Sequence, residues 1–128
     1  MGAEADATRQ DFFFREVMDP FVRDLLDAQD PWHAYSAVAS MRGAMHDYVE
    51  WGPDGGAVYI AWADLEDLYD TGKTPIADAH AALRRAALDW LARPADPSRA
   101  YIAQWVDNAN RAVAALVRRD GGFWTSPA

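Results

Sequence analysis

Histidine and carboxylate side chains are the groups in this chain that are suited to metal binding or proton transfer. The histidines are His33, His46 and His80. His33 and His46 fall on one predicted helix, about 140° apart around its axis, so they cannot serve one ion. His46 and Glu50 share a side of that helix one turn apart, but the remaining ligands of a metal set are not evident. The sequence has no HxxxH, HExxH or ExxH pair and predicts neither a metal site nor a cofactor.

Two pairings of arginine with histidine are candidates for binding a ligand or a partner. Arg42 and His46 lie on one rim of the apolar stripe predicted for residues 31–51. Arg84 follows His80 one turn later on the helix predicted for residues 75–93. A guanidinium at the edge of a buried face needs a partner, because unpaired burial is costly. Arg42 therefore either forms a structural ion pair with an aspartate of another helix or binds an anion together with His46. His80 falls on an apolar face, where a satisfied core histidine is the simpler interpretation.

The acidic residues between positions 64 and 70 have spacings that magnesium sites use. Asp67 and Asp70 form a DxxD, and Asp47 and Glu50 form a DxxE. The carboxylates at positions 64, 67 and 70 nevertheless fan over about 120° of a helix surface, which predicts a solvated acidic face. Nucleophilic chemistry has little support, because the chain has no cysteine, no GxSxG, no Walker A motif and no GxGxxG. An enzyme is therefore not the favoured interpretation.

Composition indicates one globular domain with an uneven charge. The chain has 128 residues, 51% of them hydrophobic, and a formal net charge of −8. Residues 1–72 carry 4 basic and 15 acidic side chains, whereas residues 73–128 carry 8 and 5, so the two parts have net charges of −11 and +3. This balance disfavours nucleic acid and would steer a basic protein to the first part or let two copies dock. The 26 alanines, 16 aspartates and 11 arginines beside one lysine are typical of a high-GC bacterial or phage gene.

Helix signals recur along the chain. Capping side chains precede proline at Asp19-Pro20, Asp30-Pro31 and Thr74-Pro75, and Gly72 is a stop signal. Pro20 should kink or restart the first helix. Apolar residues repeat every three to four positions between such signals, which predicts helices over 9–28, 31–51, 57–71, 75–93 and 97–119. The expected fold is all-α, a compact single-domain bundle of about five helices with short loops.

The predicted domain organisation is a flexible N-terminus at 1–8, a helical bundle at 9–120 and an aromatic C-terminal tail at 121–128. A β-hairpin around 48–62 is the alternative for the middle of the chain, because Val58, Tyr59 and Ile60 favour strands. No apolar run approaches the roughly 18 residues of a membrane span. Without a targeting segment, a cytoplasmic protein is expected.

Aromatic excess, uneven charge and the lack of a convergent catalytic set together favour a small acidic protein-interaction module. Such an adaptor, regulator or inhibitor, of phage or toxin-neutralising type, would bind a protein partner or itself by apolar docking and electrostatic steering. The side chains expected to be exposed for docking are Phe12, Phe13, Ile60, Trp51 and Trp124. The alternative is a helical enzyme or small-molecule binder, with a pocket lined by Trp62, Trp90 and Trp105 and with Arg42, His46 and His80 as polar groups.

Overall fold

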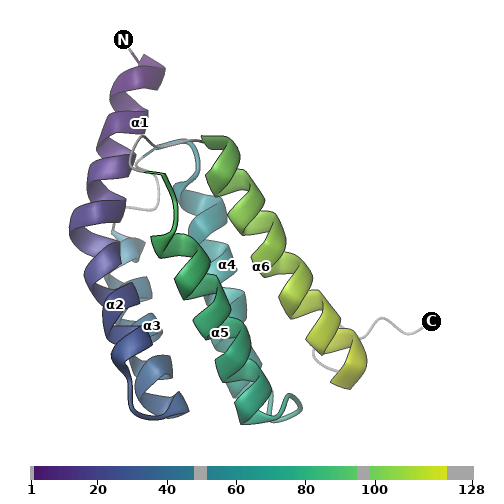
Figure 1. The fold of residues 1–128 in the computed structure, drawn as a ribbon. Coiled ribbons are helices and arrows are strands. Elements are labelled where there is room, and N and C mark those ends of the chain that lie inside the picture. The colour runs from purple at the N-terminus through teal and green to yellow at the C-terminus, as the bar shows by residue number, and fades with distance from the viewer. Residues whose placement is uncertain (1, 48–51, 95–98, 121–128) are drawn as a thin grey trace.

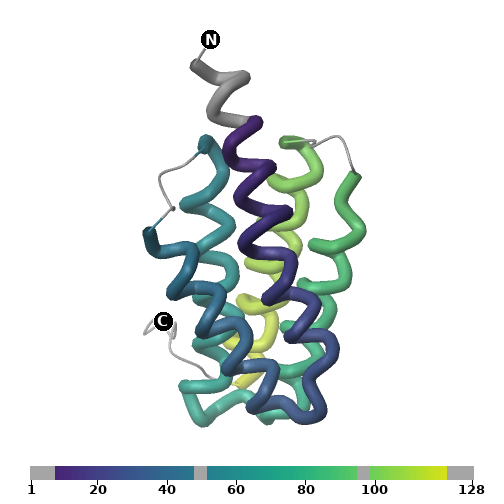
Figure 2. The backbone as a smooth tube through the Cα atoms, turned by 90° about the vertical axis from the view of Figure 1, so that its left-hand side faces the viewer, coloured from purple at the N-terminus to yellow at the C-terminus, as the bar shows by residue number. Residues whose placement is uncertain are grey.

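The chain folds as an up-and-down helical bundle, which confirms the all-α prediction (Figure 1). The computed structural model describes residues 2–47, 52–94 and 99–120, with side chains from Thr8 onward. Successive helices run in opposite directions, as short connections between neighbours require (Figures 1 and 2). The elements are α1 (Gly2–Phe13), a π-helical turn η1 (Phe14–Met18), α2 (Asp19–Asp27), α3 (Pro31–His46), α4 (Gly55–Asp70), α5 (Ile76–Leu91) and α6 (Arg99–Asp120).

The first three elements form one continuous helical rod. Pro20 neither ends nor restarts it, because the wider π turn places the Asp19 N–H on the carbonyl of Phe14 just before the proline. The rod begins at Gly2, earlier than the predicted start at residue 9, so the part assigned to a separate N-terminus is helical from residue 2. Alanines at 3, 5 and 7 give this segment a high helix propensity.

The middle of the chain is helical rather than a hairpin. Residues 55–70 form α4, and no strand occurs in the described parts of the chain; residues 48–51 lie outside them. Val58, Trp62 and Leu65 recur at helical spacing and are fully buried, so helical periodicity outweighs the β propensity of individual residues. The preceding helix α3 ends at His46, with Asp47 as its C-cap.

The predicted caps differ in outcome. Asp30 is a true N-cap, since its carboxylate accepts from the N–H groups of Trp32 and His33 at 2.9 and 3.0 Å. Thr74 is not a cap, because Pro75 occupies that position without a side-chain bond. Asp19 lies inside the first rod, where its carboxylate is buried.

Three tryptophans and a phenylalanine form the centre of the core. The ring centroids of Trp62, Trp90 and Trp105 lie 4.9–6.2 Å apart, and Phe14 lies 4.9 Å from Trp90. These rings come from η1, α4, α5 and α6 and are almost completely buried. The expected pocket lined by the three tryptophans is therefore wrong: the rings fill the space between the helices.

The upper end of the bundle is fastened by one aspartate. Asp54, just before α4, accepts from the Gln10 Nε2 of α1 at 3.0 Å, and its own N–H donates to Gln10 Oε1 at 2.7 Å. Arg99 at the start of α6 pairs with the same carboxylate at 3.1 Å. Three helices thus meet at Asp54. In the parts of the chain that are described, no helix has the length and apolar character needed to cross a membrane.

Candidate functional site

The surface formed by α3 and α4 brings together the polar residues that the sequence singled out near position 42. α3 and α4 pack side by side, and α4 is also in contact with α5 and α6. One strip of α4 between α3 and α6 therefore faces outward. We call this surface the acidic face and define it by Trp32 and Tyr35 of α3 and by Ile60, Asp64, Asp67 and Asp70 of α4.

Arg42 forms the expected ion pair, but with a glutamate. Its Nη1 lies 2.7 Å from Oε2 of Glu66 on α4, and the guanidinium lies 5.5 Å from the ring centroid of Tyr59. The pair is only partly satisfied. Arg42 Nε and Glu66 Oε1 are buried and have no hydrogen-bond partner among the described residues. An unused donor and an unused acceptor therefore lie beside each other, which in a native structure calls for an explanation.

A small cavity of about 350 Å³ opens at this pair. Gly43 and Ala39 provide little side-chain volume on the α3 side, and a Cβ at Gly43 would meet nothing within 4 Å. The missing side chain thus leaves room rather than allowing a close helix contact. The lining residues are Ala39, Arg42, Gly43, His46, Tyr59 and Glu66.

Three carboxylates crowd next to the cavity. Oxygens of Glu66, Asp67 and Asp70 lie within 4.8 Å of one another. Burial raises the pKa of Glu66, with Arg42 opposing and the two aspartates adding to the shift. Burial also raises the pKa of Asp67 and of Asp64. Neither Asp64 nor Asp67 lies within ion-pair distance of a described arginine, but the nearby charge of Arg42 opposes part of the rise in the pKa of Asp67. The acidic face therefore carries more negative than positive charge.

Aromatic rings border the acidic cluster at the other end of the face. Trp32 is 49% exposed and packs edge-on against Tyr35 and Tyr69, at 5.4 and 5.5 Å between centroids. The hydroxyl of Tyr35 donates to Asp70 at 2.9 Å and so connects the rings to the carboxylates. Tyr69 is buried, which raises its pKa to about 12. The half-exposed indole is therefore held in a fixed orientation.

The histidines and the second arginine have separate roles. His46 is exposed at the cavity mouth, and the Nδ1 of His80 lies 3.3 Å from the Tyr69 hydroxyl. Burial, together with the charge of Arg84, lowers the pKa of His80. Arg84 itself donates to the Leu26 carbonyl at 2.9 Å, which fastens α5 to the end of α2. His80 and Arg84 thus do not join Arg42 and His46 in one site.

The remaining predicted site residues are partly in the core, partly exposed and partly outside the described residues. Trp62 is a core residue, buried with no partner for its Nε1 among the described residues. Phe13, expected to be exposed, is buried, whereas Phe12 and Ile60 are exposed. Glu50, Trp51 and Trp124 lie outside the described residues. Trp32 was not among the residues predicted from the sequence, although a tryptophan two residues after the Asp30 cap and outside the Ala34–Val38–Met41 stripe was an available signal.

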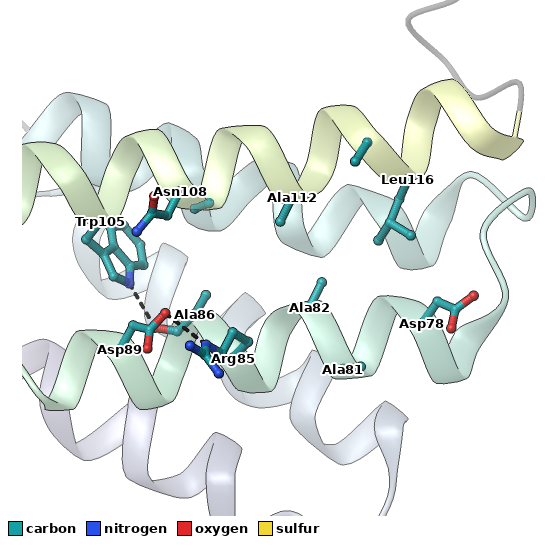
Figure 3. A pocket seen from close by; sticks show the side chains of 12 residues that line it. Asp78, Ala81, Ala82, Arg85, Ala86, Asp89, Trp105, Asn108, Ala112 and Leu116 are labelled. Carbon is teal, nitrogen blue, oxygen red and sulfur yellow. Dashed lines mark hydrogen bonds and ion pairs between the residues drawn. The ribbon is translucent and has the colours of Figure 1, made fainter.

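A second concave surface lies between α5 and α6 (Figure 3). It is a groove of about 570 Å³. Half of its lining residues are alanines, with Trp105 and Asp89 toward one end and Leu116 and Asp78 toward the other. Trp105, a member of the predicted tryptophan pocket, lines this groove, and the polar groups beside it are Arg85, Asp89 and Asn108 rather than Arg42 and His46.

Comparison with known protein families, with curated proteins and with solved structures found no match to this chain. The chemistry of the site must therefore be argued from its geometry. Carboxylates that outnumber the one nearby arginine attract cations, and an edge of fixed aromatic rings offers an apolar contact. The Arg42–Glu66 pair offers one donor and one acceptor.

Proposed function

We propose that this chain is a protein-interaction module, acting as an adaptor, regulator or inhibitor, whose acidic face binds a basic segment of a partner protein. The observation that carries the proposal is the composition of that face. Half-exposed Trp32 and 58%-exposed Ile60 flank the carboxylates of Asp64, Asp67 and Asp70, and no described arginine lies within ion-pair distance of those carboxylates. A mainly acidic centre between apolar side chains complements a basic segment with apolar neighbours.

The expected contacts differ along the face. An arginine or lysine of the partner would meet the carboxylates at Asp67 and Asp70, and a second cation or an apolar side chain would pack against Trp32. Ile60 lies ten residues, or about 15 Å, along α4 from Asp70, so a partner segment of a few residues can reach both ends. The net charge of −11 on residues 1–72 would speed the encounter with a basic partner.

The cavity at Arg42 would supply specificity. A peptide group carries one acceptor and one donor, which matches the unused Arg42 Nε–H and the unused Glu66 Oε1. Because both atoms are already buried, a partner segment that shifts the Arg42 and Glu66 side chains and inserts a backbone amide between them would satisfy two groups at once. A segment that covers the cavity without bonding would leave both groups unpaired. The chain would act as an inhibitor if its rigid acidic face occupied a basic site on a toxin or a nucleic-acid-binding protein.

The experiment measures binding of a fluorescein-labelled peptide of alternating arginine and leucine by fluorescence anisotropy. The double variant D67N/D70N should weaken binding roughly tenfold, since it removes two charges that contact the peptide. The matched control is D24N/D27N, which removes the same charge from exposed positions on α2. If both double variants weaken binding equally, net charge alone explains the affinity and the proposed face is wrong.

Trp32→Ala tests the aromatic part of the face in the same assay. Loss of the indole should weaken the peptide by roughly fivefold, because an exposed cation–π or apolar contact contributes about 1 kcal/mol. Phe12→Ala is the control, since Phe12 is an exposed ring on α1, outside the acidic face. Equal effects of the two substitutions would contradict a specific role for Trp32.

A further inference from the structure

The groove between α5 and α6 has contacts between the two helices at each of its ends. The Tyr101 hydroxyl of α6 donates to the carbonyl of Asp89 on α5, and at the far end Arg119 lies 2.7 Å from Asp78. Trp105 fixes the floor by donating to the Ala86 carbonyl at 2.8 Å. In Figure 1, α6 leans away from α5 toward its C-terminal end. These contacts fix the position of α6 relative to α5 along the groove.

The floor and walls of the groove are apolar and partly exposed. The side chains between the contacts at the two ends are mostly methyl groups, which cannot fill the space between the helices. Ala81, Ala112 and Ala115 are exposed, and Leu88 on the outer side of α5 is 50% exposed. Small side chains let another helix approach closely, and a leucine is the kind of side chain that fills such a groove.

The distribution of charge along the chain indicates which molecule would occupy the α5–α6 groove. Any contact between two copies that used the first part of the chain would bring together surfaces whose net charge is −11 each, whereas residues 73–128 carry +3. On α5 and α6 most of that charge is already paired: Arg85 with Asp89, Arg111 with Asp107, and Arg119 with Asp78. The α5–α6 surface is therefore where two copies repel each other least.

The charge pairs beside the groove are also self-complementary. Arg85 and Asp89 are opposite charges one turn apart on α5. If two α5 helices cross antiparallel about a two-fold axis near residue 87, Arg85 of each copy faces the Asp89 of the other. The same axis brings Leu88 of each copy over the partner's alanine-lined groove.

We propose that the α5–α6 groove is a self-association surface, and that a second copy of this chain occupies it in a symmetric dimer. Leu88 of each copy inserts into the groove of the other, and Arg85 and Asp89 exchange their ion pairs between copies. α5 is 16 residues, or about 24 Å, long. An interface formed by two such helices per copy buries an area at the small end of the range for specific protein–protein interfaces. The dimer should therefore be weak, with a dissociation constant of micromolar order. This inference is independent of the acidic face.

The first test is sedimentation velocity over about 5–500 μM, a range that spans micromolar dissociation constants. The wild-type chain should change from monomer to dimer with concentration. Leu88→Gln should raise the dissociation constant by at least roughly tenfold, while Ile60→Gln, an equally exposed apolar position on the acidic face, should leave it unchanged. A monomer at every concentration, equal effects of the two substitutions, or association into species larger than a dimer would overturn the proposal.

Charge reversal tests the two-fold arrangement itself. Arg85→Asp and Asp89→Arg should each prevent self-association, because each places like charges opposite one another. An equimolar mixture of the two variants should form a heterodimer, since opposite charges then meet again. Arg15→Asp, which disrupts the Arg15–Asp11 pair on the first rod, is the matched control and should dimerise like wild type. Failure of the mixture to associate would refute the proposed geometry, as would a groove that binds an apolar dye in a chain that never dimerises.

Discussion

Two ion pairs in this bundle are built very differently. Asp19 and Arg93 form a bidentate pair with bonds of 3.1 and 3.0 Å, and both side chains are more than nine-tenths buried, at 8% and 7% exposed. Arg42 and Glu66 share a single 2.7 Å bond, with exposures of 26% and 10%. The first pair joins the start of α2 to the residues just after α5, and the second lies between α3 and α4.

The two pairs differ most in how completely they are satisfied. Asp19 also accepts from the indole N–H of Trp90 at 2.8 Å, and Arg93 also donates to the Trp90 carbonyl and lies 4.5 Å from the Trp90 ring centroid. Arg42 and Glu66 each keep one buried polar atom without a partner among the described residues. Leaving such an atom unpaired costs about 1–3 kcal/mol. The Asp19–Arg93 network is thus complete, whereas the Arg42–Glu66 pair leaves polar atoms unpaired beside a cavity.

Removing one member of the complete pair should have the largest effect. Asp19→Ala leaves Arg93 buried without a counter-charge and the Trp90 N–H without an acceptor, so the free energy of unfolding should fall by about 3–5 kcal/mol. Chemical denaturation measures the change. A loss below about 1 kcal/mol would show that water reaches Arg93 and that the two pairs do not differ as described.

The incomplete pair should cost much less to remove. The double variant R42M/E66L replaces both groups by apolar side chains and removes both unpaired atoms, so stability should change by less than about 1 kcal/mol. The corresponding double variant D19L/R93M should remain clearly destabilised, because the Trp90 N–H loses its acceptor. Equal losses in the two double variants, measured by the same denaturation, would contradict the comparison.

The sequence predicted that Arg42 needs an acidic partner, but it did not predict the pair of Asp19 with Arg93. Periodicity placed the helices well, because burial of one stripe per helix is a local property. It also indicated that Arg42 needs an acidic partner. That the partner is Glu66 rather than an aspartate depends on how α3 packs against α4, which no local pattern contains. The role of Asp19 was missed for the same reason, since it resembles a cap and its true partners are more than 70 residues away.

Aromatic residues show the same limit. Three tryptophans on three helices are compatible with a lined pocket or with a filled core, and the choice depends on side-chain packing between helices. The rings of Trp62, Trp90 and Trp105 pack on one another, so they fill the core. Trp32 lies outside every apolar stripe and remained half-exposed. A tryptophan outside the stripe was thus the better indicator of a surface contact.

Substitution of Gly43 tests whether the cavity beside the Arg42–Glu66 pair is open. A Cβ there meets nothing within 4 Å, so Gly43→Ala should raise the free energy of unfolding by about 0.5–1 kcal/mol, the difference in helix propensity. Gly52→Ala is the contrasting substitution. Gly52 has φ +92° and a Cβ there would lie 2.4 Å from that of Gln10, so stability should fall. Thermal unfolding distinguishes the two, and a loss of stability in Gly43→Ala would mean that the cavity is filled.

The smallest expected effect concerns the charge beside the incomplete pair. Burial raises the pKa of Asp67, with the charge of Arg42 opposing and Asp70 adding to the shift, so its ionisation opposes folding at neutral pH. Folding therefore gains stability as pH falls through the raised pKa. Asp67→Asn should therefore stabilise the chain at pH 7 by a few tenths of a kcal/mol. The gain should vanish below about pH 4, where the unfolded carboxyl is also protonated.

Asp24→Asn on α2 is the control and should change little at either pH. The two variants and the wild type share His80, whose lowered pKa makes stability fall on acidification below about pH 6.5, so that contribution cancels in the differences. A destabilising Asp67→Asn at pH 7 would mean that this carboxylate is already compensated, as both groups of the Asp19–Arg93 pair are.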